Sequence, residues 1–207
     1  MKAACGTVFI SNLIGAIRSG SLQRMFCALL TGMIVTTNVA AAETAFIPVG
    51  VASPPPAGAI QLCKTYSWAC AKESFRTLSL TSELEVVRQV NRSVNSSTRE
   101  VPDRTQYKTV EKWALPTASG GDCEDIALLK KKELVKAGVS PKRLLIATVL
   151  DRSKSGHAVL VYRSSNGDMI LDNQTNRIRP WSATKYLFLR MQDPNQPHRW
   201  IGVYRRS

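Results

Sequence analysis

The chain has 207 residues, 44% of them hydrophobic, and its 28 basic and 15 acidic side chains give a net charge of +13. This length and apolar content suit one domain with an ordinary core. The basic charge favours polyanions or acidic protein partners. The sequence has no zinc-finger spacing, no RNA-binding aromatic signature and no long Lys/Arg run, which argues against a nucleic-acid-binding protein.

The first 42 residues predict a secretory signal peptide. Basic residues without any acid come first, an apolar run follows at 25–35, and the small residues Ala40 and Ala42 fit a cleavage site before Glu43. The run is shorter than the roughly 20 apolar residues that a spanning helix needs. We therefore expect export and no stable membrane span after cleavage; an uncleaved N-terminal anchor is the alternative.

The cysteines after the signal fit an oxidising compartment. They are Cys63, Cys70 and Cys123, and the near neighbours Cys63 and Cys70 are the expected disulfide pair. The bridge requires a break in the helix, because a continuous helix would separate the two Cα atoms by about 10 Å. Residues 43–80 should thus form an N-terminal arm and a disulfide segment. Its Pro-, Ala- and Gly-rich part, 43–59, is predicted to lie on the surface or to be mobile.

The core domain, which we place at 81–207, should begin with an amphipathic helix. Ser82 and Glu85 would form a capping box at its start, and apolar residues recur at helical spacing as far as Val94. The polar stretch 96–108 then predicts a loop, followed by a short helix or turn in the segment VEKWALP.

A second helix and several strands follow. Asp122 is a candidate N-cap and Gly138 a candidate stop, so that Cys123 falls in the first helical turn. Residues 144–150 predict a buried strand, and GHAVLVYRSSNGDMILDN predicts two more around a turn. The tail HRWIGVYRR predicts a further strand. Helices followed by an antiparallel meander indicate an α+β fold.

Three of these residues suggest nucleophilic catalysis. The unpaired N–H groups and the dipole of a helix start lower the pKa of a thiol, which favours a reactive Cys123. A nucleophile also needs a base and a group that orients the base. His157 opens one predicted strand and Asp172 closes the next. Each residue also has a purely structural alternative. Cys123 could be a small residue of the core, His157 a strand residue with its hydrogen bonds satisfied, and Asp172 a turn residue.

The contact between His157 and Asp172 depends on the turn between their strands. A two-residue turn at 166–167 would pair Val161 with Asp172 and leave His157 about 13 Å away. A four-residue loop at 163–166 would place His157 opposite Asp172 on the same face. We predict the longer loop, or a diagonal pairing close to it.

Together, GGDCEDIALLKKKELVKAG, GHAVLVY and MILDNQ resemble the three motif blocks of the bacterial transglutaminase-like cysteine proteinases, over roughly residues 82–203. The resemblance implies a papain-like, transglutaminase-like core with Cys123 as nucleophile, His157 as general base and acid, and Asp172 as the orienting carboxylate. The LapG-like members are periplasmic, calcium-dependent proteases that clip large surface adhesins. It thus implies a periplasmic enzyme whose protein substrate is a surface adhesin and whose partner is an inner-membrane regulatory protein.

Acidic neighbours create an electrostatic problem for the thiol. Asp122, Glu124 and Asp125 each oppose ionisation of Cys123. A bound divalent cation would reverse that local charge, and carboxylates suit Ca²⁺. The resemblance implies that Asp122 and Glu124 bind calcium, with Asp125 as a further contributor. The alternative is that these acids only favour the helix dipole.

The expected activity is hydrolysis through a thioester acyl-enzyme, with the Cys123 N–H as a candidate oxyanion donor. Transfer of the same acyl group to an amine, as in a transglutaminase or amidotransferase, is one alternative. A non-catalytic envelope protein that binds through its basic surface is the other. Trp113 and Trp181 are expected to pack in the core rather than to line a peptide groove.

Overall fold

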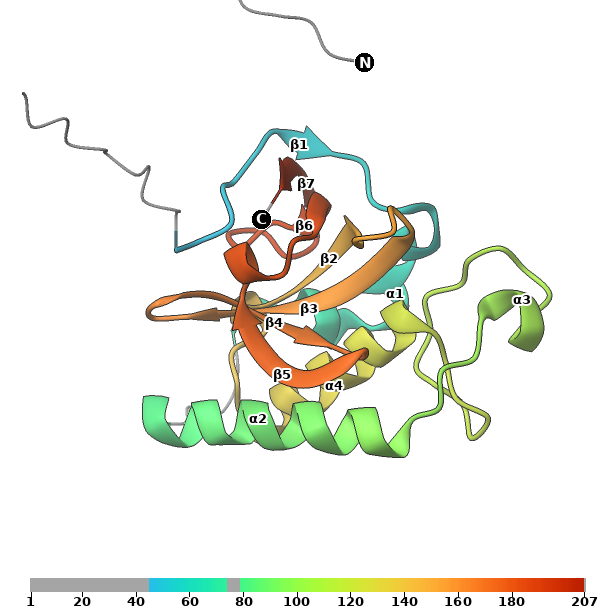
Figure 1. Ribbon diagram of the computed structural model, residues 1–207, viewed down its shortest axis with the longest axis horizontal. Coiled ribbons are helices and arrows are strands. Elements are labelled where there is room, and N and C mark those ends of the chain that lie inside the picture. Colours follow the sequence, from blue (N-terminus) through green and yellow to red (C-terminus); the bar gives the residue numbers. More distant parts are fainter. Residues whose placement is uncertain (1–44, 74–78, 207) are drawn as a thin grey trace, which may run out of the picture. The chain divides into compact units, whose positions relative to one another are not determined.

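One antiparallel sheet of seven strands, in the order β1-β7-β6-β2-β3-β4-β5, organises the protein (Figure 1). This computed structural model describes residues 45–73 and 79–206, so the predicted signal peptide lies outside the described residues. The strands are β1 (Ala52–Ser53), β2 (Leu144–Leu150), β3 (Gly156–Ser164), β4 (Gly167–Asp172), β5 (Thr175–Pro180), β6 (Leu187–Gln192) and β7 (Trp200–Arg206). The strands predicted at β2, β3, β4 and β7 are confirmed, whereas β1, β5 and β6 carry no clear alternation and were not predicted.

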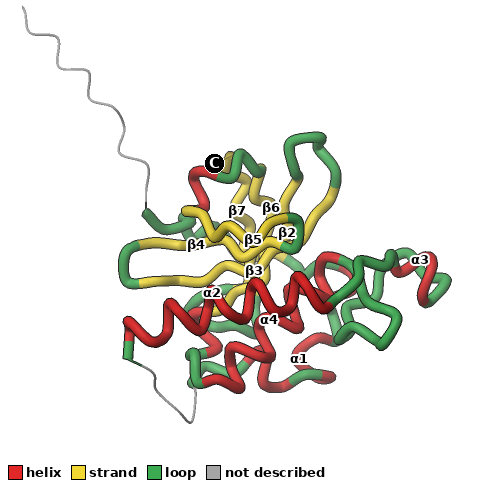
Figure 2. Tube along the Cα trace, turned by 60° about the horizontal axis from the view of Figure 1, so that its bottom comes forward, coloured by secondary structure: helices red, strands yellow, loops and turns green. Residues whose placement is uncertain are grey.

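Helices cover one face of this sheet, with α2 and α4 side by side (Figure 2). The α-helices are α1 (Leu62–Thr65), α2 (Leu80–Ser97), α3 (Asp103–Gln106) and α4 (Cys123–Ala137), and the 3₁₀ turns are η1 (Ala57–Ala59), η2 (Ser67–Cys70), η3 (Pro141–Arg143) and η4 (Trp181–Ala183). The predicted α+β fold is confirmed. None of the helices within 45–73 and 79–206 combines the length and the apolar character that crossing a bilayer requires.

Both faces of the sheet are buried. Along β2, Leu144 and Ile146 pack toward the helices, whereas Leu145 and Ala147 belong to a second apolar cluster. Successive strand residues point to opposite faces, so the two clusters lie on the two sides of the sheet. This burial explains why β2 is a continuous apolar run rather than an alternating one.

The N-terminal arm lies largely on the surface, as predicted, but one of its residues belongs to this second cluster. Ile47 is only 1% exposed, and its N–H donates to Asp168 Oδ2 at 2.8 Å. Farther along, Ala52 of β1 pairs with Ile201 of β7. The outer face of the sheet needs an apolar cover, and the arm supplies part of it.

The predicted disulfide between Cys63 and Cys70 is present, with the two Cα atoms 5.5 Å apart. The helical path breaks at Tyr66, which lies between α1 and η2 with φ −129° and ψ 77°. This break brings the two cysteines closer than a continuous helix allows.

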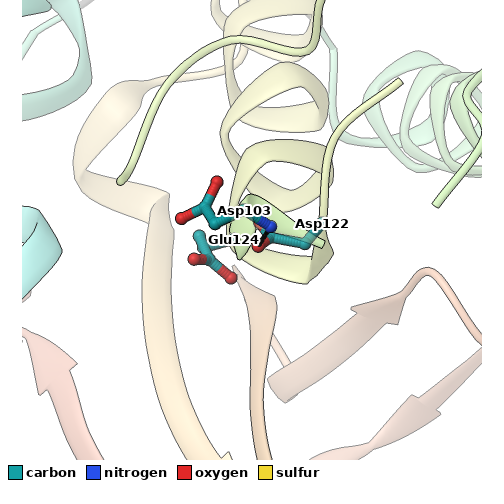
Figure 3. Close-up of side chains that lie close together, drawn as sticks. All are labelled: Asp103, Asp122 and Glu124. Carbon is teal, nitrogen blue, oxygen red and sulfur yellow. Dashed lines mark hydrogen bonds between the residues drawn. The ribbon is translucent and has the colours of Figure 1, made fainter. Parts of the chain in front are cut away.

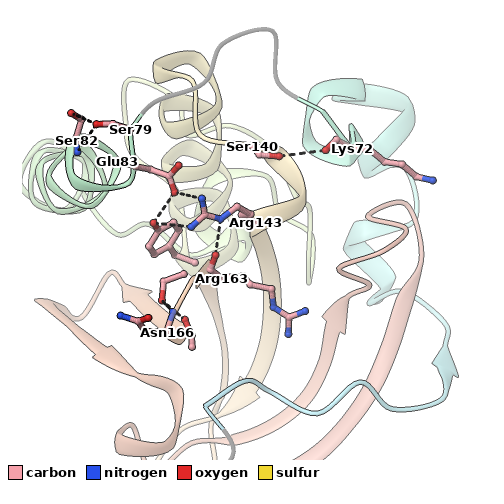
Figure 4. Close-up of polar contacts among 11 residues, drawn as sticks. Lys72, Ser79, Ser82, Glu83, Ser140, Arg143, Arg163 and Asn166 are labelled. Carbon is pink, nitrogen blue, oxygen red and sulfur yellow. Dashed lines mark hydrogen bonds and ion pairs between the residues drawn. The ribbon is translucent and has the colours of Figure 1, made fainter.

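Helix α2 begins earlier than predicted. Its N-cap is Ser79, whose Oγ accepts from the Ser82 N–H at 3.4 Å, so Ser82 lies inside the helix. Buried Glu83 accepts from Arg143 at 2.7 Å and from the Tyr162 hydroxyl at 2.7 Å, which ties α2 to η3 and β3 (Figure 4). Ser79 thus caps the helix locally, and the tertiary contacts of Glu83 anchor its first turn to the sheet.

The connection from α2 to α4 also differs from the prediction. The polar stretch 96–108, predicted as a loop, contains the four-residue helix α3. The segment VEKWALP, predicted as a short helix or turn, is irregular from residue 111 to residue 116. Its Trp113 is buried and meets Trp200 edge to face, with ring centroids 5.6 Å apart. The packing of this indole, rather than helical hydrogen bonds, therefore holds the segment in place.

Candidate active site

Cys123 is the first residue of α4 and lines a cleft of about 470 Å³. The other walls come from the end of β2, the start of β3, β6 and two irregular segments: Pro56, Ala57, Val110, Glu111, Trp113, Asp122, Glu124, Thr148, Val149, Gly156, His157, Ala158, Leu189 and Arg190. Trp113 therefore packs in the core, as predicted, and also borders this cleft. Trp181 is buried in the second apolar cluster, as predicted.

His157 and Asp172 lie together in a buried pair, with Nε2 and Oδ1 3.0 Å apart. The predicted four-residue loop is wrong, because Ser164 pairs with Gly167 and the turn holds two residues. Since Leu160 pairs with Leu171, extension of the ladder sets Asp172 opposite Val159. His157 is then the diagonal neighbour on the same face, close enough for long side chains to meet. The diagonal alternative is thus the observed arrangement.

Further polar groups hold Asp172 in place. The Tyr186 hydroxyl donates to Oδ2 at 2.6 Å, and the Gln174 N–H donates to Oδ1 at 3.0 Å. Asn95 of α2 donates to the Asp172 carbonyl at 2.9 Å. Burial raises the pKa of Asp172, but hydrogen bonds from His157, Tyr186 and Gln174 outweigh it and leave the pKa below its usual value. The carboxylate is therefore ionised and fixed in orientation.

The Cys123 thiol is held in its neutral form. Burial raises its pKa, and the charge of Glu124 raises it further; Sγ donates to Glu124 Oε2 at 3.2 Å. The Ala158 N–H, next to His157 in β3, opposes this by stabilising the thiolate. The helix start alone does not offset burial and a neighbouring acid, so formation of the thiolate requires a change in the local charge.

Three acids converge beside Cys123. Asp103, Asp122 and Glu124 each offer one oxygen, and these oxygens all lie within 4.8 Å of one another (Figure 3). Burial and the charge of Asp122 raise the pKa of Glu124 to about 8. Burial, followed by the charge of Asp103, raises the pKa of Asp122. The cluster thus concentrates negative charge in a poorly solvated place.

These acids fit a divalent cation. Asp103 Oδ1 and Asp122 Oδ1 are buried without a hydrogen-bond partner among the described residues. Asp122 occupies the N-cap position, but its side chain makes no capping hydrogen bond. Unpaired buried carboxylate oxygens are costly unless a cation or a proton compensates them, and hard oxygen ligands suit calcium.

The structure places Asp125 outside this group of oxygens. Its Oδ1 accepts from the Ala114 N–H at 2.7 Å, which holds the segment that carries Trp113. Burial raises its pKa to about 7. Asp125 therefore shapes the wall of the cleft.

The family profile described as "Bacterial transglutaminase-like cysteine proteinase BTLCP" matches residues 49–207. The chain belongs to this family. It is therefore a cysteine peptidase, and the profile covers most of the N-terminal arm together with the sheet and helices.

One solved structure shares the fold of this cysteine proteinase. Calcium-bound LapG of Legionella pneumophila aligns with a TM-score of 0.50 at 21% identity, over 64% of this chain and 74% of that one. EGTA-treated LapG aligns with a TM-score of 0.46 at 22% identity, over 57% and 66% of the two chains. No curated protein sequence matches significantly.

Sequence reasoning missed two polar residues of the proteinase site. Asp103 lies 19 residues before Asp122 in a polar stretch, and Tyr186 follows the short turn η4. Neither stands in a motif, since isolated Asp and Tyr residues occur throughout the sequence. No local signal marked Asp103, which is the first residue of the short helix α3 and follows its N-cap, Pro102.

Proposed function

We propose that the protein is an exported cysteine endopeptidase that hydrolyses peptide bonds through a thioester on Cys123. His157 is the general base and acid, and Asp172 orients its ring. The observation that carries this proposal is the buried His157–Asp172 pair, at 3.0 Å, beside the cleft that His157 and Cys123 both line. A nucleophile, a base and an orienting acid in this order are the minimum set for acyl transfer from a peptide.

The proton path follows from the ring geometry. Asp172 binds Nε2, so a ring protonated at Nε2 leaves the Nδ1 lone pair to accept the thiol proton. The thiolate attacks the peptide carbonyl, and Nδ1–H then protonates the leaving amine as the C–N bond breaks. Water gives a proton to Nδ1 and attacks the thioester, which releases the acid and restores the thiol.

Backbone groups at the start of α4 complete the site. The first N–H groups of a helix have no intrahelical acceptor. The Cys123 N–H is one of them and can donate to the oxyanion that forms on the substrate carbonyl.

We propose that Asp103, Asp122 and Glu124 bind calcium. The calcium-bound state of LapG, a structure of the same fold, supports this choice of ion. When bound, the cation supplies positive charge that offsets the three carboxylates and so lowers the free-energy cost of the Cys123 thiolate. The buried oxygens of Asp103 and Asp122 without partners are the feature of this chain that favours it.

The cellular role is a proposal from family resemblance and from the sequence. The signal-like residues 1–42 support export to the periplasm, although they lie outside the described residues. Large surface adhesins are the proposed substrates, and an inner-membrane regulatory protein is the proposed partner. Residues 1–42 carry three basic and no acidic side chains, so the exported chain keeps a net charge of +10, which suits acidic segments in such proteins.

The test compares new protein N-termini in envelope fractions from cells that carry wild type, Cys123→Ala or His157→Ala, with and without a calcium chelator. The exposed His198 gives a matched control, His198→Ala. We expect termini that require Cys123, His157 and calcium but not His198. Termini that do not depend on Cys123 would contradict the peptidase proposal. Incorporation of heavy oxygen from water into the new C-termini separates hydrolysis from transfer to an amine.

A further inference from the structure

The acidic side chains that line the active-site cleft have interaction partners, whereas one of its basic side chains has none among the described residues. Its acids are Glu111, Asp122 and Glu124, and apart from His157 its one basic side chain is Arg190 of β6. Each acid is already engaged, since Glu111 accepts from the Trp113 indole at 2.8 Å and the other two belong to the acid cluster. The Arg190 guanidinium has no hydrogen bond or ion pair within residues 45–73 and 79–206, and its side chain is partly exposed.

Strand pairing sets the backbone distance between Arg190 and Ala158, the residue beside the reacting thiol. The Ala158 N–H contacts the Cys123 sulfur, Thr148 pairs with Ala158, and Arg190 pairs with Thr148 on the other side. These partners share one face of the sheet. Two strand spacings are about 10 Å, which an extended peptide covers in about three residues.

We propose that Arg190 determines specificity by pairing with an Asp or Glu side chain of the substrate, about three residues from the scissile bond. This inference rests on the proposed function. The planar guanidinium matches a carboxylate with two parallel hydrogen bonds, and nothing else within the cleft competes for it. The preference is electrostatic in a solvent-accessible place, so it weakens as salt rises.

The probe is a peptide library made from a denatured bacterial proteome and incubated with the calcium-loaded enzyme. Sequencing of the new termini gives the residues preferred on each side of the cut. The best acidic peptide is then resynthesised with the amide (Asn or Gln) and with Lys at that position. The quantity measured is the ratio of kcat/KM values for the acidic and amide peptides. Because both values come from one preparation, a change in the folded fraction cancels.

We expect wild type to favour the acidic peptide about tenfold, as for one charge-assisted pair. Arg190→Gln should bring the ratio close to one, and Arg190→Glu should make the Lys peptide the better substrate. Arg190→Lys should retain part of the preference, because lysine keeps the positive charge but cannot donate the two parallel hydrogen bonds of a guanidinium. The control Arg177→Gln, at an exposed position on β5, should keep the wild-type ratio.

Two results would overturn the inference. Cleavage by wild type without an acid preference, or a preference that survives in Arg190→Gln, excludes Arg190 and leaves the peptidase proposal standing. A wild-type enzyme that cleaves no peptide while Cys123 still reacts with a thiol reagent contradicts the proposed hydrolysis of peptides, and the role of Arg190 with it.

Discussion

The acid cluster should make the calcium-free protein less stable as pH rises. The pKa of Glu124 moves from 4.5 to about 8 in the folded protein, because of burial and the charge of Asp122. Between these values the folded chain holds a proton that the unfolded chain has released. Unfolding then releases this proton, so the free energy of unfolding falls as pH rises through this window.

The size of this loss follows from the same shift. One pH unit corresponds to about 1.4 kcal/mol, so the interval from 4.5 to about 8 sets an upper limit of about 5 kcal/mol. Glu124 is only 7% exposed, so solvent screens it weakly. Glu124→Gln has no proton to lose. In chelator near pH 8 it should therefore be more stable than wild type, by up to about 5 kcal/mol.

Urea unfolding followed by tryptophan fluorescence, in chelator and across this pH window, measures the difference. Glu133→Gln is the matched control, because it removes an acid of the same helix that lies outside the cluster. Calcium at about 100 times its Kd should add about 2.7 kcal/mol to wild type and much less to Glu124→Gln. Equal pH slopes for wild type and Glu124→Gln would refute the reasoning.

Three further predictions concern the positioning of the site and the arm. Asp172→Asn should lower kcat about a hundredfold with an unchanged circular dichroism spectrum, because His157 loses its orienting carboxylate; wild-type turnover would remove Asp172 from the triad. Tyr186→Phe removes the hydroxyl that donates to Asp172 Oδ2 and should lower the free energy of unfolding by about 2 kcal/mol at neutral pH. The pKa of Asp172 is depressed, so this loss should shrink as the pH falls and the carboxylate is protonated, and an equal loss at low pH would contradict the assignment. Replacing both Cys63 and Cys70 by Ser should cost about 2.5 kcal/mol in thermal or urea unfolding, the chain-entropy value for a loop of this length; unchanged stability would exclude that role.

Local signals predicted the parts of the fold that local physics determines. Helix α4 begins after Asp122 at the N-cap position, has Cys123 in its first turn and ends at a left-handed Gly138, as predicted, although the Asp122 side chain makes no capping hydrogen bond. The continuous apolar run of β2 was enough to predict that strand. The break between Cys63 and Cys70 followed from the length of a helical path.

Contacts between distant segments could not be predicted in this way. The arm carries no sustained period, yet Ile47 is buried because the outer face of the sheet is apolar. The contacts of Glu83 with Arg143 and Tyr162, which join α2 to η3 and β3, could not be read from the capping pattern of the helix.

The sequence by itself determined the identities and local settings of Cys123, His157 and Asp172, because caps, turns and apolar runs act over a few residues. Only the tertiary structure decided the diagonal register that joins His157 to Asp172, the Tyr186 hydroxyl that fixes it, and the approach of Asp103 to Asp122 and Glu124. The registers that set Val161, Val159 or His157 opposite Asp172 differ in steps of two residues, so they keep both side chains on one face and change only the distance between them, at almost no local cost. The choice between registers therefore depends on the packing of the whole sheet.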